Sequence, residues 1–257
     1  MDAFAELLLD GTGLALWSFL LLCGVSFLGS FISAAMGLGG GSLVLAAMAL
    51  FLPPAVLIPV HGTVQLGSNF GRAVLLRPHI LTSIVPAFLL GTALGAAIGV
   101  QLVIALPIAV LQGVLAAFIL YSTWAPKFRA RNPGKKTFFG LGALVAFVTM
   151  FVGATGPLIA PFIAAASGQR QQVVATHAAL MTLQHGLKIV AFGAVGFAFG
   201  PYLPLLAGLL GFGFAGTFAG RHLLNRLPER TFRIGLKAIL TAIALRLLYG
   251  AASVGLG

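Results

Sequence analysis

The side chains of this chain that could carry chemistry are basic or imidazole groups placed inside apolar stretches. They are His61, Arg72, His177, His185 and Lys188. All four acidic residues stand instead near the start of the chain or in an expected loop, at positions 2, 6, 10 and 229. A sodium site built on acidic ligands, a proton relay of carboxylates and paired-carboxylate catalysis therefore lack their parts. Cations and hydrogen-bond donors that face a cavity suit an anion as the ligand.

The first of these groups belongs to a polar stripe if residues 61–72 are helical. At about 100° per residue, His61, Gln65, Ser68 and Arg72 fall on one face, and Asn69 lies at its edge. An ionisable group at bilayer depth costs roughly 2.5 to 3.5 kcal/mol or more unless it is paired or hydrated. We therefore expect the stripe to face protein or a water-filled cavity, although Arg72 could also reach the membrane surface from a helix end.

A second polar stripe repeats the first one 116 residues later. His61, Asn69 and Arg72 correspond to His177, His185 and Lys188, and Gln184 shares the second face. The neutral donors of both stripes suit the oxygens of a small polar solute, or equally a polar seam between helices. The spacing of the two later histidines would also permit zinc. No cysteine or carboxylate lies near them, so we predict no metal.

Glycine-rich breaks precede both stripes. The first reads Gly37-Leu38-Gly39-Gly40-Gly41, and the second reads Gly153-Ala154-Thr155-Gly156-Pro157. A helix that starts after such a break has free backbone N–H groups and a partial positive charge at its first turn, which suits an oxyanion. Close helix packing through small residues is the alternative interpretation of these glycines.

The composition places these stripes in a membrane protein. Of 257 residues, 60% are hydrophobic and 7% are charged, and the mean hydropathy is +1.09. Apolar runs of membrane-crossing length, about 17 to 25 residues, recur along the chain without alternating, which predicts an all-α polytopic membrane protein and excludes a sheet barrel. The basic residues behind the net charge of +11 cluster in two short loops. The positive-inside bias of membrane insertion explains such loops better than nucleic-acid binding does.

The two halves of the chain read as homologous repeats. Besides the stripes, Gly95, Gly99 and Leu102 recur 121 residues later as Gly216, Gly220 and Leu223. We assign residues 1–126 to a first membrane repeat, 127–136 to a basic cytoplasmic loop and 137–257 to a second repeat. The late basic loop around Arg226 corresponds to an uncharged loop near Leu106. Matching loops on opposite sides of the membrane predict an inverted repeat of ten segments.

Two segments in this count are too short to cross a bilayer. One covers residues 157–167, and the other covers residues 61–76 after a break expected near residues 59–60. Short segments interrupted by glycine or proline at corresponding places in two halves indicate a midplane binding site made by broken helices. If these pieces instead merge with their neighbours, the chain has eight spans and the repeats could be parallel.

These motifs resemble the sulfite exporter TauE/SafE family of membrane proteins. The resemblance covers nearly the whole chain and rests on the two glycine breaks, on Pro161, and on Gly99-x-x-Leu102 with Leu106-Pro107, which recur late in the chain. The chain departs from the family at Ala46, where a proline is usual. The resemblance implies export, or sometimes uptake, of sulfur-containing anions such as sulfite, sulfoacetate and other sulfonates.

We therefore predict a multi-pass protein of the cell inner (plasma) membrane that exports sulfite or an organosulfonate by alternating access, without enzyme activity or a cofactor. The predicted substrate-binding residues are Gly39, Gly40, Gly41, His61, Gln65, Asn69, Arg72, Gly156, His177, Gln184, His185 and Lys188. The partners are the small anion and the lipid bilayer, with a homodimer as an open alternative.

An anion channel and a proton-coupled uptake carrier are the competing functions for the same residues. A membrane enzyme subunit is a candidate from another class. The sequence argues against it, because it lacks a nucleophile and base set, a recognisable pattern of haem-ligand histidines and a nucleotide-binding domain.

Overall fold

The computed structural model describes residues 12–36, 40–124, 130, 133–167, 169–223 and 229–255, and this part of the chain is built from helices and their connections. The α-helices of the first half are α2 (Leu16–Met36), α3 (Gly40–Met48), α4 (Pro54–Leu75), α5 (Val85–Val103) and α6 (Ile108–Trp124). Those of the second half are α7 (Lys135–Val152), α8 (Gly156–Ala166), α9 (Arg170–Ala194), α10 (Leu203–Leu223) and α11 (Glu229–Gly255). Three short 3-10 turns complete the described part: Arg77–His79, Thr82–Ile84 and Gly200–Tyr202.

Five helices are long and apolar enough to cross a membrane, judged by length and composition. They lie in α2, α5, α7, α10 and α11. Helices α4 and α9 are as long, with 22 and 25 residues, but they carry the polar stripes and are not among these five. The predicted all-helical membrane class is thus confirmed, whereas the number of crossing segments stays a prediction.

The two helices that follow the glycine breaks are short. Helix α3 has 9 residues and α8 has 11, about half of what a bilayer requires. The predicted break near residues 59–60 is wrong, because α4 begins at Pro54 and runs through Pro59. The chain turns instead at residues 49–53. Pro53 and Pro54 suit the start of a helix, because proline has no backbone N–H and the N–H groups of the first turn have no partner within the helix.

Close helix pairs are formed between the two halves of the chain. Helix α5 packs along α7, and α10 packs along α2. A methyl group added at Gly95 would overlap the carbonyl oxygen of Ala143, and one added at Gly216 would overlap that of Phe27. Only glycine permits this approach, so Gly95 and Gly216 let the paired helices pack closely.

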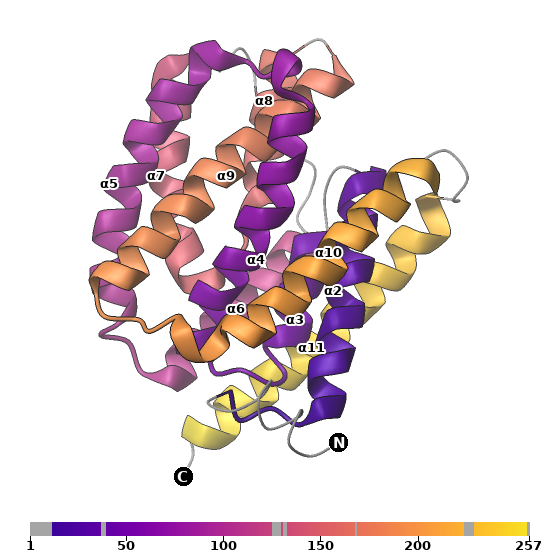
Figure 1. The fold of residues 1–257 in the computed structure, drawn as a ribbon. Helices are drawn as coiled ribbons and strands as arrows, with labels where there is room; N and C mark the ends of the chain where they lie inside the picture. Colours follow the sequence, from indigo (N-terminus) through magenta and orange to yellow (C-terminus); the bar gives the residue numbers. More distant parts are fainter. Residues whose placement is uncertain are drawn as a thin grey trace.

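Helices α4 and α9 cross in the middle of the molecule, between the pair α5 and α7 and the group of α2, α10 and α11 (Figure 1). The two helices run in opposite directions. Gly62 of α4 lies beside the Lys188 side chain of α9, whereas Arg72, further along α4, shares a cavity with His177, which lies earlier in α9. The polar stripes of the two helices therefore face each other.

Candidate functional site

A small polar cavity lies where α2, α3, α4, α8 and α9 meet. Its volume is about 40 Å³. It is lined by Ser33, Gly41, Ser42, Gln65, Asn69, Arg72, Ala154, Gly156, Pro157, His177, Met181 and His185. The described lining contains one guanidinium, two imidazoles, two side-chain amides and two hydroxyls, and it contains no carboxylate. Such a lining offers hydrogen-bond donors and positive charge to a small ligand.

Arg72 is the fixed cation of this cavity. Its Nε donates to the Ser68 carbonyl oxygen at 3.2 Å, Nη1 donates to the Ser33 carbonyl oxygen at 3.3 Å, and Nη2 donates to Asn69 Oδ1 at 2.9 Å. The side chain is 9% exposed. Among the described residues it has no acidic partner, because its three bonds go to neutral oxygens. Two of its five N–H donors are not used by these bonds and are available to an oxyanion.

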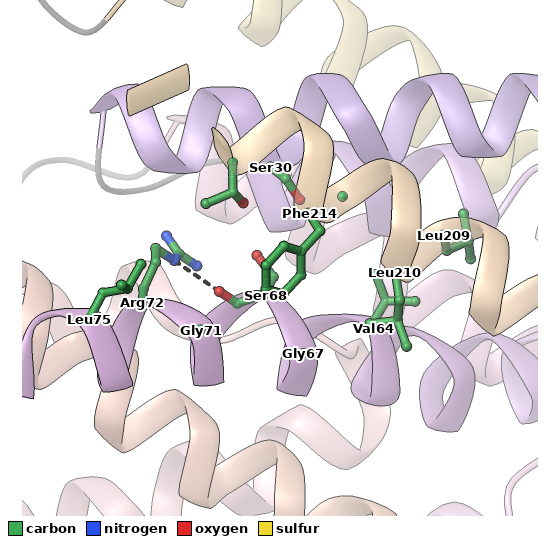
Figure 2. A pocket seen from close by; sticks show the side chains of 12 residues that line it. Ser30, Val64, Gly67, Ser68, Gly71, Arg72, Leu75, Leu209, Leu210 and Phe214 are labelled. Carbon is green, nitrogen blue, oxygen red and sulfur yellow. Dashed lines mark hydrogen bonds between the residues drawn. The ribbon is translucent and has the colours of Figure 1, made fainter. Parts of the chain in front are cut away.

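Arg72 also lines a second cavity, on a neighbouring face of α4 and toward α10. This cavity has a volume of about 40 Å³ and is mostly apolar. Figure 2 shows Arg72 and Ser68 of α4 joined by their hydrogen bond, with Phe214 of α10 and Ser30 of α2 across from them. Arg72 is thus the residue common to a polar and an apolar cavity.

The first histidine of each stripe bonds to the start of a short helix. His61 Nε2 donates to the carbonyl oxygen of Gly41 at 3.0 Å, and His177 Nε2 donates to that of Gly156 at 3.2 Å. The Gly156 carbonyl can only accept a hydrogen bond, so the His177 ring carries its proton on Nε2, whereas His61 Nε2 lies between the Gly41 carbonyl oxygen and Gln65 Nε2, which is 3.2 Å away. The two bonds fix α3 to α4 and α8 to α9 at the edge of the cavity.

Lys188 lies behind the cavity and does not line it. Its side chain is fully buried, and Nζ donates to the Gly153 carbonyl oxygen at 2.9 Å. Gly153 caps the C-terminal end of α7 with a φ of 77°, and its carbonyl oxygen also accepts a hydrogen bond from Thr149 Oγ1 at 3.1 Å. The Lys188 charge therefore sits at the negative end of the α7 dipole, where it is stabilised.

Two buried polar atoms of α9 have no hydrogen-bond partner within the described residues. They are Gln184 Oε1 and His185 Nδ1. The Gln184 amide nitrogen is satisfied, because Nε2 donates to Thr155 Oγ1 at 2.7 Å. An unpaired buried polar atom costs about 1–3 kcal/mol, so these two atoms favour a bound water or a polar solute next to α9.

The structure brings seven of the twelve predicted site residues to the cavity wall: Gly41, Gln65, Asn69, Arg72, Gly156, His177 and His185. His61, Gln184 and Lys188 are buried around it without lining it. Gly40 packs against Gly29 of α2, where a methyl group would overlap the backbone, and Gly39 lies outside the described residues.

Sequence reasoning missed five residues of the cavity wall: Ser33, Ser42, Ala154, Pro157 and Met181. Ser42 and Pro157 directly follow predicted site glycines, so their position in the chain was a usable signal. Ser33 and Met181 carried no such signal, because each lies in an otherwise ordinary helical sequence.

A comparison with known protein families identifies the family of this chain. A model of the family described as "Sulfite exporter TauE/SafE" matches residues 22–247. The chain belongs to the sulfite exporter TauE/SafE family. TauE/SafE proteins are membrane transporters of sulfur-containing anions, and several apolar helices of this chain agree with a multi-pass membrane protein. No curated protein and no solved structure matches the chain.

Proposed function

We propose that this TauE/SafE protein exports sulfite or a small organosulfonate by alternating access around the polar cavity. The observation that carries the proposal is the cavity wall itself, where Arg72 stands with His177 and His185 and no carboxylate is present among the lining residues. A bound anion would neutralise Arg72 and supply acceptors to the imidazole and amide donors. A bound cation would find none of the acidic ligands that it requires.

The membrane potential is sufficient to drive export of an anion. With the cell interior negative, each negative charge that leaves gains roughly 2.3 kcal/mol per 100 mV. Neither a nucleotide nor a sodium ion is needed. The substrate would enter from the cytoplasm, occupy the cavity, and leave after the two halves of the protein move against each other.

Two inverted repeats are part of the proposal, with residues 1–126 and 137–257 as the copies. Gly95 and Gly216 are 121 residues apart, and the residues that they approach, Phe27 and Ala143, are 116 residues apart. Both separations equal those of the sequence repeat. The antiparallel course of α4 and α9 supports inversion, because equivalent helices of an inverted repeat run in opposite directions through the membrane.

A flux measurement tests the function and the site together. Proteoliposomes containing the full chain are exposed to labelled sulfite under an imposed membrane potential, and wild type is compared with Arg72→Gln and Lys188→Gln. We expect potential-driven, saturable flux in the wild type and its loss in both variants. Lys237→Gln, which removes a cation far from the cavity beside Trp124, is the matched control and should keep wild-type flux.

Each other outcome has a definite meaning. Wild-type flux in both the Arg72 and the Lys188 variant, with normal folding, would make Arg72 and Lys188 structural charges. Flux that does not saturate would favour an anion channel over a carrier. Flux driven by a proton gradient in the absence of a potential would favour proton-coupled uptake through a histidine.

A further inference from the structure

The facing polar stripes of α4 and α9 form a polar seam, and this seam ends at an apolar layer made by Ile58 and Phe192. Ile58 precedes His61 by three residues on α4, and Phe192 follows Lys188 by four residues on α9. Residues three or four apart share a helix face, so both apolar side chains lie one turn beyond the last polar groups of the seam.

Both side chains are almost fully buried. Ile58 is 1% exposed and Phe192 is 4% exposed, and both belong to one buried cluster with Ala96 and Val100 of α5 and Met150 of α7. The layer therefore joins α4 and α9 to the helix pair that flanks them. A hydrated anion cannot pass such a layer without losing its water.

A third cavity, separate from the two that Arg72 lines, opens on the far side of this layer. It has a volume of about 360 Å³ and is mostly apolar, and Ile58 and Phe192 form part of its wall. The rest of the wall comes from the start of α4, the α5–α6 connection, the start of α6 and the segment after α9, including Ala55, Ile104, Leu106 and Phe197. The layer thus separates a polar cavity from an apolar one along the same seam.

The distribution of charged residues places the apolar space on the outer side of the membrane. The connections around it, residues 49–53, 104–107 and 195–199, contain no charged residue. At the opposite ends of the same helices, Arg77 follows α4 and Arg170 begins α9. The positive-inside rule places those basic ends in the cytoplasm.

We propose that Ile58 and Phe192 form the outer gate of the transport pathway and that the apolar space is its outer vestibule. This inference rests on the proposed transport function. In the conformation described, the gate is closed, so the anion site is not reached from outside. Outward release requires α4 and α9 to separate at these two side chains. The gate also prevents other small anions from leaking through the polar seam.

Cysteine labelling tests the gate without any transport measurement. Native Cys23 is buried, so a Cys23→Ser background is used with single cysteines at Ala55, in the vestibule, and at Ser42, in the polar cavity. A membrane-impermeant methanethiosulfonate is added from outside to cells or oriented vesicles. We expect Ala55→Cys to react quickly and Ser42→Cys to react at least tenfold more slowly.

Widening the gate should remove that difference. In Phe192→Ala, and to a smaller extent in Phe192→Leu, we expect Ser42→Cys to become reactive from outside. Phe88→Ala and Phe88→Leu are the matched controls, because Phe88 is equally buried in a different cluster, and they should leave Ser42→Cys protected. Labelling of Ser42→Cys from the cytoplasmic side shows in every variant that the cavity is formed.

Two results would overturn the gate. One is rapid labelling of Ser42→Cys from outside when Phe192 is intact. The other is continued protection in both Phe192 variants while cytoplasmic labelling stays normal. Because the assay needs no substrate, a failure of the sulfite measurement would leave these results unchanged, and the two proposals fail separately.

Discussion

Arg72 and Lys188 occupy the same position of the repeated sequence pattern but have different surroundings. Arg72 faces the polar cavity and bonds to three oxygens, whereas Lys188 is buried behind it and bonds to the end of α7. Arginine offers five donors in a rigid plane, and lysine offers a compact charge on a flexible stem. The two cations should therefore respond differently to substitution.

Arg72→Lys keeps the charge of the cavity but removes the planar fork of donors. A hydrogen bond to a charged group contributes about 1.5–3 kcal/mol, and about 1.4 kcal/mol is a factor of ten in an equilibrium constant. We expect the half-saturation concentration for sulfite to rise about tenfold or more, measured by flux at increasing sulfite concentration. An unchanged value would mean that Arg72 acts only as a charge.

Gly153→Ala tests the residue that holds Lys188. The φ of 77° at Gly153 is unfavourable for any residue with a Cβ, and the new methyl would lie 2.6 Å from Leu45 Cδ1. The backbone strain alone costs about 1–2 kcal/mol. We expect a lower midpoint of thermal unfolding in detergent. Gly140→Ala, in α7 with open space around it, should leave the midpoint equal or slightly raised.

At the scale of helices, some described glycines approach a neighbouring backbone, some approach side chains, and others have open space around them. Gly216 approaches the Phe27 carbonyl, whereas Gly113 of α6 has no atom within 4 Å of an added methyl. The same chemical change should therefore have opposite effects at the two positions. This contrast separates the effect of a Gly→Ala change on packing between helices from its effect on the intrinsic stability of one helix.

Gly216→Ala forces α10 away from α2, and overpacking of this kind costs about 1–3 kcal/mol. Gly113→Ala removes a helix-interior glycine and should stabilise α6 by about 0.5–1 kcal/mol. The thermal unfolding midpoints of both variants in the same detergent give the comparison. Equal midpoints would contradict the close contact between α2 and α10.

The sequence was sufficient to predict the helical membrane class, because continuous apolar runs permit little else. It also predicted the short helix after the second glycine break and seven residues of the cavity wall, but it expected the helix after the first break to be longer than α3. It misplaced the turn before α4, because the polar stripe at His61 suggested a new segment while Pro53 and Pro54 determine the start. The Lys188 bond to Gly153 depends on where α7 ends in space, and no local pattern contains that information.

For the whole molecule, the inverted arrangement makes a test of topology possible. Ala105 lies in the exposed α5–α6 connection, and Arg226 stands 121 residues later, outside the described residues. Under the proposal the two positions are equivalent in sequence and opposite in the membrane. Single cysteines there, in the Cys23→Ser background, should be labelled by an impermeant thiol reagent from outside and from inside respectively. Labelling of both from one side would favour parallel repeats.

The pairing of α5 with α7 and of α10 with α2 has a consequence for the origin of the chain. If the chain arose by duplication, as proposed, each copy contributes one helix of each pair, and that helix packs against a helix of the other copy. A single ancestral unit would have left both surfaces uncovered, so it would have existed as two subunits inserted in opposite orientations. The present gene, divided at residues 127–134, should yield two fragments that assemble only when they are produced together.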